Sequence, residues 1–466
     1  MTNSQLVAGV DSSTQSVKVV LCDVQTGEIK KTITRPHPDG TEVDPIHWLN
    51  ALNEALSEAE TFGEISAIAI GGQQHGMVLL DANGEVIRPA LLWNDTRSDK
   101  TAVALNSEFP EIAKLTGSQL VASFTAAKVR WVAEHEPENI AKVAAICLPH
   151  DWLSWKLTGS KDINDLFTDR SDASGTGYFN PTTNDYLPEI LKSILKSDRK
   201  VVLPRIVSAN QFGAKSAKGI PIAAGCGDNA GAAFGINSQI GDMVISLGTS
   251  GTAFISTKTA THDQSGEVAG FADATGNFLP LACTLNAAKI FATISKTLGM
   301  TFEEFSEAAL SAPIGSNGLR LITHFDGERT PNKPNATGTF YGITHQNFTP
   351  ANIARAAIEG VIAGMRYAAD AISKLNVPIN RVILVGGAAR NQAVQEVAST
   401  FFDYEIAVPE PGEYVALGAA RQAAWALSGK AQPPTWSASQ IKVIEKKPKS
   451  QDLFAQYQRL IQGNSN

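Results

Sequence analysis

Residues Leu6 to Leu21 read LVAGVDSSTQSVKVVL, two apolar runs separated by a small polar turn. This pattern predicts a β-hairpin. Backbone N–H groups and hydroxyls in such a turn can hold phosphate oxygens, and Asp11 beside it can hold a hydrated magnesium ion. Serine and threonine occur in turns of every kind, so the segment indicates a fold more strongly than a function.

The second half of the chain repeats this order of elements. Residues 243–256 read MVISLGTSGTAFIS, another strand, small turn and strand. In each half a later apolar run also ends in a pair of glycines, within 65–72 and within 381–387. The repeat predicts two similar α/β domains that face each other across an interdomain cleft. The Thr14 and Thr249 turns would lie opposite one another, with nucleotide phosphates between them, and such a cleft can close.

Each half also contains a helix rich in alanine and glycine. One starts near Asn229, and the other covers Leu417–Ala424. Small residues let two helices cross closely, so we expect these two to do so. The pattern predicts an N-terminal domain over 1–236, a C-terminal domain over 237–430, and a linker with a final helix over 431–466.

One carboxylate, Asp228, stands where an apolar run gives way to the first of these helices. Residues 220–235 read IPIAAGCGDNAGAAFG, in which Gly225 and Gly227 allow a tight turn. A carboxylate at this strand-to-helix turn can face a cleft and feel the positive end of a helix, as suits a general base. The alternative is that Asp228 caps the helix, and this stretch alone favours the cap.

Polar groups suited to a sugar follow the first pair of glycines. Gln74 and His75 each offer donor and acceptor capacity at the end of a buried strand, and Trp93 lies in a segment that could border the same pocket. The alternative is a loop whose polar groups satisfy local backbone. Residues 171–177 resemble one more exposed turn. The histidines that lack a carboxylate or cysteine at ligand spacing are taken as ordinary ones: His150, His324 and His345.

Composition excludes several classes of protein. Of 466 residues, 43% are hydrophobic and 18% charged, which is ordinary for a globular chain. A net charge of −7 argues against a general nucleic-acid binder. The four cysteines are far apart and suggest neither a zinc site nor disulfides. Neither a signal-type segment nor an 18-residue apolar run occurs, so we expect a cytoplasmic protein that does not bind membranes.

Two long segments carry a resemblance that covers nearly the whole chain. Residues 123–135 read SFTAAKVRWVAEH; residues 338–343 read GTFYGI and are followed by Asn352-Ile353 and by AAIE at 356–359. Both are similar to signatures of the FGGY family of carbohydrate kinases. The resemblance implies an α/β fold with two duplicated actin-like, ribonuclease H-like ATPase domains.

The resemblance also implies roles for individual residues. Asp228 matches the proton acceptor, Gln74 and His75 match the pair that contacts the sugar, and Asn229 assists. Asp11 matches the carboxylate near magnesium. The positions that match nucleotide-binding residues are Thr14, Gly248, Thr249, Gly386, Gly387 and Asn391. Three positions depart from the family pattern: Ser13 replaces a glycine, Gln74 a methionine found in some members, and Ala127 a proline.

The implied reaction transfers the γ-phosphoryl group of ATP, with Mg²⁺, to the primary hydroxyl of D-xylulose. Another ketopentose or a polyol is the alternative substrate, and a homodimer is an allowed assembly. Two other classes stay open. An actin-like ATPase without kinase activity would leave Gln74, His75 and Asp228 without a task. A dinucleotide-binding oxidoreductase fits poorly, because Asp242 precedes the next strand instead of ending it.

Overall fold

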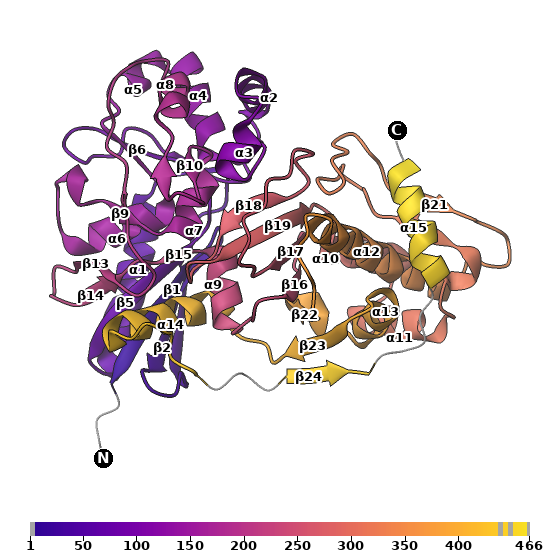
Figure 1. Cartoon of the computed structure of the whole chain (residues 1–466). Helices are drawn as coiled ribbons and strands as arrows, with labels where there is room; N and C mark the ends of the chain where they lie inside the picture. The colour runs from indigo at the N-terminus through magenta and orange to yellow at the C-terminus, as the bar shows by residue number, and fades with distance from the viewer. Residues whose placement is uncertain (1–4, 437–440, 446–450, 464–466) are drawn as a thin grey trace.

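Two seven-stranded sheets organise the chain in the computed structural model, which describes residues 5–436, 441–445 and 451–463 (Figure 1). The first sheet has the order β13-β14-β5-β1-β2-β3, with β15 beside β5. Its strands are β1 (Leu6–Ser12), β2 (Ser16–Asp23), β3 (Ile29–Pro36), β5 (Ile65–Gly72), β13 (Phe212–Lys215), β14 (Pro221–Ala223) and β15 (Cys226–Gly227). The predicted hairpin is confirmed as the antiparallel pair β1 and β2, and β5 runs parallel to β1.

The second sheet repeats the core of the first. Its order is β18-β19-β17-β16-β22-β23-β24. Its strands are β16 (Asp242–Leu247), β17 (Gly251–Ile255), β18 (Ala269–Ala272), β19 (Phe278–Thr284), β22 (Arg381–Val385), β23 (Glu405–Pro409) and β24 (Ile441–Ile444). Strand β16 pairs antiparallel with β17 and parallel with β22, as β1 does with β2 and β5. The predicted duplication of α/β domains is therefore confirmed.

Helices cover both sheets. In the first half they are α1 (Ile46–Ala59), α2 (Asp99–Glu108), α3 (Ile112–Thr116), α4 (Thr125–His135), α5 (Pro137–Ile140), α6 (Pro149–Thr158), α7 (Arg170–Ala173), α8 (Pro188–Leu195) and α9 (Asp228–Gly235). In the second half they are α10 (Ala288–Leu298), α11 (Phe302–Ser311), α12 (Pro350–Ser373), α13 (Gln392–Phe401), α14 (Tyr414–Ser428) and α15 (Gln451–Gly463). Two-stranded pairings link β4 (Glu42–Val43) to β7 (Ala90–Leu91), β6 (Val78–Leu80) to β8 (Ala145–Cys147), β9 (Phe167–Thr168) to β12 (Arg205–Ile206), β10 (Phe179–Asn180) to β11 (Asp185–Tyr186), and β20 (Arg320–Ile322) to β21 (Thr339–Tyr341).

Successive side chains of each strand point to opposite faces of its sheet, and both faces are packed. In β1, Ala8 and Val10 join the cluster that contains Trp48 and Leu52 of α1, whereas Val7 joins the cluster that contains Ala420 of α14. This is the period of two that places successive side chains on opposite faces of a strand. In the second sheet, the long helix α12 covers the face to which Met243, Ile245 and Leu247 of β16 belong.

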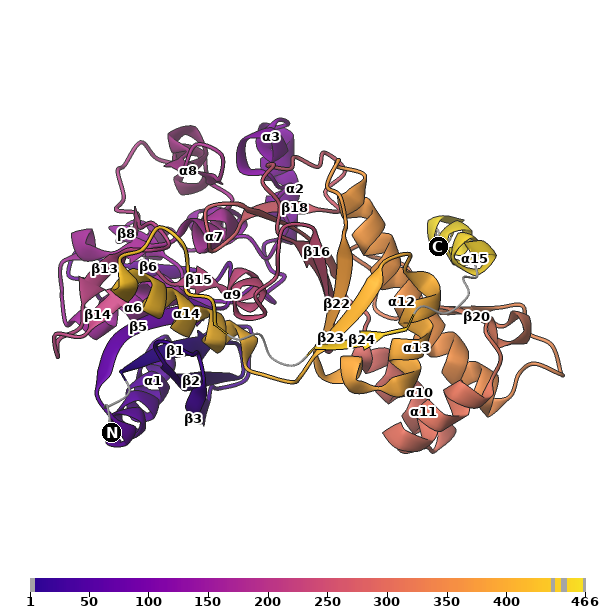
Figure 2. The same cartoon turned by 60° about the horizontal axis from the view of Figure 1, so that its bottom comes forward.

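Helix α14 belongs to the second half of the sequence but packs on the first sheet (Figures 1 and 2). A Cβ added at Gly9 in β1 would lie 1.9 Å from the carbonyl oxygen of Ala416. The same helix crosses α9, where a Cβ at Gly418 would lie 2.0 Å from the carbonyl oxygen of Gly231. The predicted close crossing of the two small-residue helices is confirmed, and it packs α14 against the helix that begins at Asp228.

The end of the chain packs on the second domain. The predicted final helix corresponds to α15, whose Leu453, Tyr457 and Ile461 are buried in the core beside α12. Part of the predicted linker forms strand β24. This strand pairs antiparallel with β23 and becomes the edge strand of the second sheet. Residues 437–440 and 446–450 of that linker lie outside the described residues. Among the helices that the structure describes, none is long and apolar enough to span a bilayer.

Candidate active site

Asp228 is the first residue of α9, directly after the short strand β15. The N-cap position is Gly227, and no side chain caps the helix, so the capping interpretation of Asp228 is wrong. The Oδ1 atom of Asp228 accepts hydrogen bonds from the backbone N–H of Asn229 at 2.7 Å and from its Nδ2 at 2.8 Å. Burial raises the pKa of Asp228 to about 6, against these two bonds. The carboxylate is therefore half-buried and held in one orientation by Asn229, and its pKa is higher than that of an ordinary aspartate.

A second carboxylate, Asp11, lies one residue before the end of the buried strand β1, and the charge of the first carboxylate affects its pKa. Its side chain is 8% exposed, and its Oδ1 atom has no hydrogen-bond partner. Burial raises the pKa of Asp11 to about 7, and the charge of Asp228 adds to that rise. Lys18 is the residue opposite Asp11 in the hairpin. Its amine forms an ion pair with Glu413 at 2.6 Å and not with Asp11. A buried unpaired carboxylate oxygen near a second carboxylate is an oxygen donor set that suits Mg²⁺.

Gln74 lies directly beside the turn that precedes Asp228. A Cβ at Gly227 would lie 2.6 Å from Gln74 Nε2, so only glycine leaves room for the amide. Gln74 Nε2 donates a hydrogen bond to the carbonyl oxygen of Ser171 at 3.0 Å. The structure thus brings together Gln74, Asp228 and Asn229.

His75 follows in a left-handed conformation, with φ of 70°. Its Nδ1 atom lies 2.7 Å from the carbonyl oxygen of Gly175, so it carries the proton and leaves Nε2 as an acceptor. The ring centroid lies 4.8 Å from that of Phe124 and 5.7 Å from that of Phe271, which belongs to the second domain. Burial lowers the pKa of His75 to about 3, so the imidazole is neutral at physiological pH.

Two side chains of helix α4 hydrogen-bond to the backbone of His75. The Thr125 hydroxyl and the Lys128 amine each donate a hydrogen bond of 3.1 Å to the carbonyl oxygen of His75, and Lys128 also bonds the carbonyl of Ser123. Lys128 is fully buried, and burial lowers its pKa to about 7. Sequence reasoning assigned no task to these donors. The available signal was a lysine on the apolar side of a helix.

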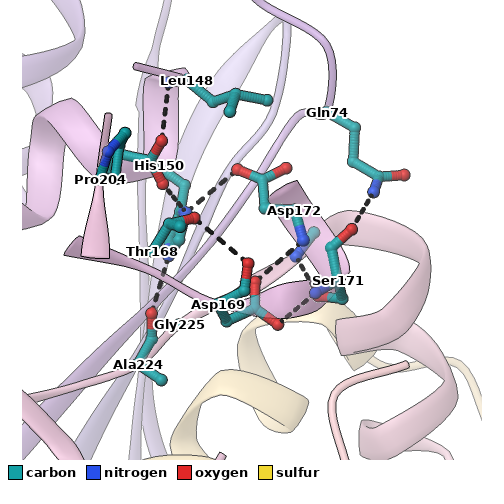
Figure 3. A network of polar contacts seen from close by, with 12 residues as sticks. Gln74, Leu148, His150, Thr168, Asp169, Ser171, Asp172, Pro204, Ala224 and Gly225 are labelled. Atoms are coloured by element: carbon teal, nitrogen blue, oxygen red, sulfur yellow. Dashed lines mark hydrogen bonds and ion pairs between the residues drawn. The ribbon is translucent and has the colours of Figure 1, made fainter. Parts of the chain in front are cut away.

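A buried polar network connects Gln74 through Ser171 to Asp169, Asp172 and His150 (Figure 3). Residues 171–177, expected as an exposed turn, are all buried, and they form the end of α7 and a 3₁₀ turn, Ser174–Thr176. That expectation is wrong because long-range partners satisfy these polar groups: the hydroxyl oxygen of Ser171, for example, accepts from the Gly227 N–H at 3.0 Å. His150 was also expected to lack a carboxylate partner, yet its Nδ1 lies 2.9 Å from Asp151 and 3.0 Å from Asp172.

The predicted nucleotide residues occupy two turns and a helix start. Thr14 Oγ1 accepts a hydrogen bond from Trp93 Nε1 at 2.9 Å, which brings Trp93 to the first turn. In the second turn, the carbonyl of Gly248 accepts from Ala288 N at 2.9 Å, and the exposed Thr249 follows it.

Gly386 has φ of 93°, and a Cβ there would lie 2.7 Å from the carbonyl oxygen of Leu247, so the position requires glycine. Gly387 is exposed and begins a 3₁₀ turn. Asn391 is the N-cap of α13, and its Oδ1 accepts from Ala393 N at 2.9 Å. The carbonyl oxygen of the Asn391 amide is therefore already used by the helix, which limits what the residue can offer a ligand.

Two residues of the second domain, Cys283 and Arg329, interact electrostatically with residues of the candidate site. Burial raises the pKa of Cys283 on β19, and the charges of Arg329 and Asp228 act on it in opposite directions. The same Arg329 charge contributes to the lowered pKa of His75. The ring contact of Phe271 with His75 brings strand β18 of the second domain against the His75 loop. That the Thr14 and Thr249 turns face each other stays a prediction.

Comparison with known proteins identifies the class. The model of the N-terminal domain of the FGGY family of carbohydrate kinases matches residues 6–235, and that of the C-terminal domain matches residues 243–427. The chain therefore belongs to the FGGY family of carbohydrate kinases. It is a phosphotransferase with an alcohol group as acceptor, which sets aside the oxidoreductase alternative.

Within this family, the chain is similar to several xylulose kinases over most of its length. The xylulose kinase of Streptomyces coelicolor is 41% identical over 442 residues, 91% of this chain and 89% of the relative. The xylulose kinase of Escherichia coli is 32% identical over 445 residues, 89% of each chain. The crystal structure of xylulose kinase from Bifidobacterium adolescentis matches with a TM-score of 0.92 at 41% identity and covers 98% of this chain and 99% of that one.

Proposed function

We propose that this kinase transfers the γ-phosphoryl group of ATP to the primary hydroxyl of D-xylulose, giving D-xylulose 5-phosphate and ADP. The observation that carries the proposal is the grouping of Asp228 with Gln74, beside His75, in a chain 41% identical to xylulose kinases. A basic carboxylate next to donors and acceptors for hydroxyl groups is the arrangement that a sugar kinase needs.

Asp228 acts as the general base. The sugar oxygen attacks the γ-phosphorus, the bond from phosphorus to the bridging oxygen of ADP breaks, and the hydroxyl proton passes to the carboxylate. A pKa of about 6 leaves Asp228 ionised at neutral pH yet more basic than an ordinary aspartate. The two hydrogen bonds from Asn229 hold the carboxylate in one orientation. Such a reaction depends on positioning and charge neutralisation more than on covalent catalysis.

Gln74 and His75 orient the sugar. Gln74 donates to Ser171, which fixes the amide plane, and the donation from His75 Nδ1 to Gly175 leaves Nε2 to accept from a sugar hydroxyl. Because the imidazole is neutral, it can discriminate hydroxyl geometry without attracting anions. Stereochemical preference among ketopentoses then follows from the fixed positions of these two side chains.

The nucleotide occupies the other side of the site in this proposal. Thr14, Gly248 and Thr249 contact phosphates through their turns, while Gly386, Gly387 and Asn391 border the adenosine. Asp11 would hold Mg²⁺, which neutralises phosphate charge when it is bound. The unpaired Oδ1 of Asp11 supports that assignment. Because the reaction consumes ATP and a free sugar, we expect it to take place in the cytoplasm. A homodimer stays a prediction, which light scattering can test.

A coupled assay of ADP release with Mg²⁺ tests the proposal. The substrates compared are D-xylulose, D-ribulose, L-ribulose, L-xylulose, glycerol and gluconate, and Asp228→Ala serves as the inactive control. We expect the highest kcat/KM for D-xylulose and a loss of at least about a hundredfold in the variant. A higher kcat/KM for another sugar would reassign the substrate. ATP hydrolysis that no sugar stimulates would replace sugar phosphorylation with a simple ATPase.

A further inference from the structure

His150 is a fully buried histidine whose two ring nitrogens both face oxygen acceptors (Figure 3). Nδ1 lies 2.9 Å from Asp151 Oδ1 and 3.0 Å from Asp172 Oδ2, and Nε2 lies 3.0 Å from the carbonyl oxygen of Ala224. A carbonyl oxygen cannot donate, so Nε2 must carry a proton. If Nδ1 lacked one, its lone pair would face two carboxylates, and one of those would have to hold the proton instead.

Two acidic groups favour the proton on the ring. Asp151 Oδ2 accepts the N–H of Leu148 at 2.8 Å, which leaves Oδ1 facing the ring. Burial raises the pKa of Asp172 to about 7, and the hydrogen bond with His150 acts against that rise and favours the ionised carboxylate. The carboxyl hydrogen bonds raise the pKa of His150 well above its usual range, against burial. An imidazolium pairs both of its N–H donors here and places one positive charge among several buried carboxyl groups.

The ring sits between the two segments that carry the site. A Cβ at Gly225 would lie 2.0 Å from His150 Nε2, and one at Gly72 would lie 2.8 Å from His150 Cβ. Gly72 precedes the Gln74 loop, and Gly225 precedes the Asp228 turn. His150 therefore packs directly on the backbone where both active-site segments leave the sheet.

The carboxylate partner of His150 leads to the same two segments. Asp172 lies in α7, whose N-cap Asp169 accepts from the backbone N–H groups of Ser171 and Asp172. Ser171 accepts from Gln74 Nε2 through its carbonyl, at 3.0 Å, and from the Gly227 N–H through its hydroxyl oxygen, also at 3.0 Å. One chain of hydrogen bonds thus runs from the Ala224 carbonyl through the imidazole and α7 to Gln74 and Gly227.

We propose that His150 is a doubly protonated positioning residue: as an imidazolium it joins Ala224 to Asp172 and holds Gln74 and Asp228 in register for the phosphoryl acceptor. It does not touch the substrate. Its charge fixes the separation of the sugar-binding amide from the base, and an error of about 1 Å there can cost a hundredfold in rate. The kinetic part of this role rests on the proposed function, whereas the protonation state of the ring does not.

A metal ion is the competing occupant, because His150, Asp151 and Asp172 offer three ligand atoms within 4.8 Å of one another. Ligands about 2.0–2.1 Å from a tetrahedral zinc ion lie roughly 3.3 Å apart. The separations of 2.9 and 3.0 Å between Nδ1 and the two carboxylates are shorter than that: the contact with Asp172 is a hydrogen bond, and the contact with Asp151 is an ion pair. The distances therefore favour a proton.

Nitrogen-15 NMR of histidine-labelled enzyme tests the protonation state. We expect both His150 ring nitrogens to carry protons between about pH 6 and pH 8.5, with His324 as an internal neutral comparison because burial lowers its pKa to about 4. Assignment comes from the His150→Gln and His324→Gln variants. A His150 nitrogen without a proton at about pH 7.5 overturns the proposal, and so does zinc that displaces the Nδ1 proton in stoichiometric amount.

Steady-state kinetics of folded His150→Gln tests the positioning role. Glutamine can donate to Ala224 or to Asp172 but cannot join them, so we expect kcat/KM for the sugar to fall at least about tenfold while KM for ATP stays within about twofold. Asp172→Asn should act in the same direction, and His324→Gln should retain the wild-type sugar KM. A His150→Gln enzyme with unchanged sugar KM and kcat overturns the role. A loss of kcat that only follows the folded fraction, with both KM values unchanged, overturns it as well.

Discussion

Replacing Asp228 with asparagine should make the protein more stable and at the same time inactive. Burial raises the pKa of this carboxyl from 3.8 to about 6 in the folded chain. Between those values the folded state binds a proton more tightly than the unfolded state, so the free energy of unfolding falls as pH rises through this window. A pKa difference of about two corresponds to about 3 kcal/mol, which is the cost of keeping the ionised group at neutral pH or above.

The Asp228→Asn variant would avoid this cost, because the new amide carries no charge and its oxygen can still accept from Asn229. Urea unfolding of wild type and variant should therefore differ little near pH 4, and the variant should be more stable by up to about 3 kcal/mol at about pH 8. Removal of the charge at this position should also lower the pKa of Asp11, which that charge raises. The same substitution should reduce kcat by about a hundredfold to ten-thousandfold, the usual contribution of a general base.

Two results would refute this reasoning. A variant that is less stable than wild type at about pH 8, with equal m-values, would mean that the buried charge is compensated rather than costly. A variant with near-normal turnover would remove Asp228 from the role of base. In the wild type, kcat should fall about tenfold per pH unit below about pH 6, because the base is then protonated. A pH-rate profile that is flat down to about pH 4.5 would contradict the raised pKa.

Three further changes test other parts of the site. Lys128→Met removes a donor from the carbonyl of His75, so KM for the sugar should rise about tenfold with KM for ATP unchanged; equal changes in both would contradict a local effect. Gly418→Ala places a Cβ 2.0 Å from the Gly231 carbonyl, so urea unfolding should show a loss of about 1–3 kcal/mol, and an unchanged midpoint would argue against the close crossing. Asp11→Asn should raise the Mg²⁺ concentration for half-maximal rate about tenfold or more, and an unchanged requirement would move the metal elsewhere.

Much of the fold could be predicted from repetition in the sequence. Two strand-turn-strand segments and two glycine-terminated strands, in the same order, indicate duplicated domains without any long-range information. The crossing of α9 and α14 was also predictable, since Gly231 and Gly418 leave backbone as the contact surface. These features depend on local residue size and on a period of two, which a sequence displays directly.

The polar interior of the site was not predictable in the same way. Residues 171–177 consist of small polar residues and glycines that usually mark an exposed turn. Their burial depends on partners far away in sequence, such as Gln74 and Gly227 for Ser171. His150 illustrates the same limit: its second carboxylate comes from Asp172, and only the folded chain brings the two together. Thr125 and Lys128 escaped notice because their acceptor is a backbone carbonyl, which has no signature in sequence.

The position of α14 has a consequence for how the protein is made. The face of the first sheet that Val7, Val20, Ala67 and Ala69 share is covered by a helix that ends at Ser428. The ribosome therefore completes strands β1 to β5 long before their apolar cover exists. At about 5–20 residues per second, that face stays bare for roughly 20 s to a minute. The N-terminal half of a nascent chain should accordingly need a chaperone, or a temporary cover of its own, until α14 emerges and docks.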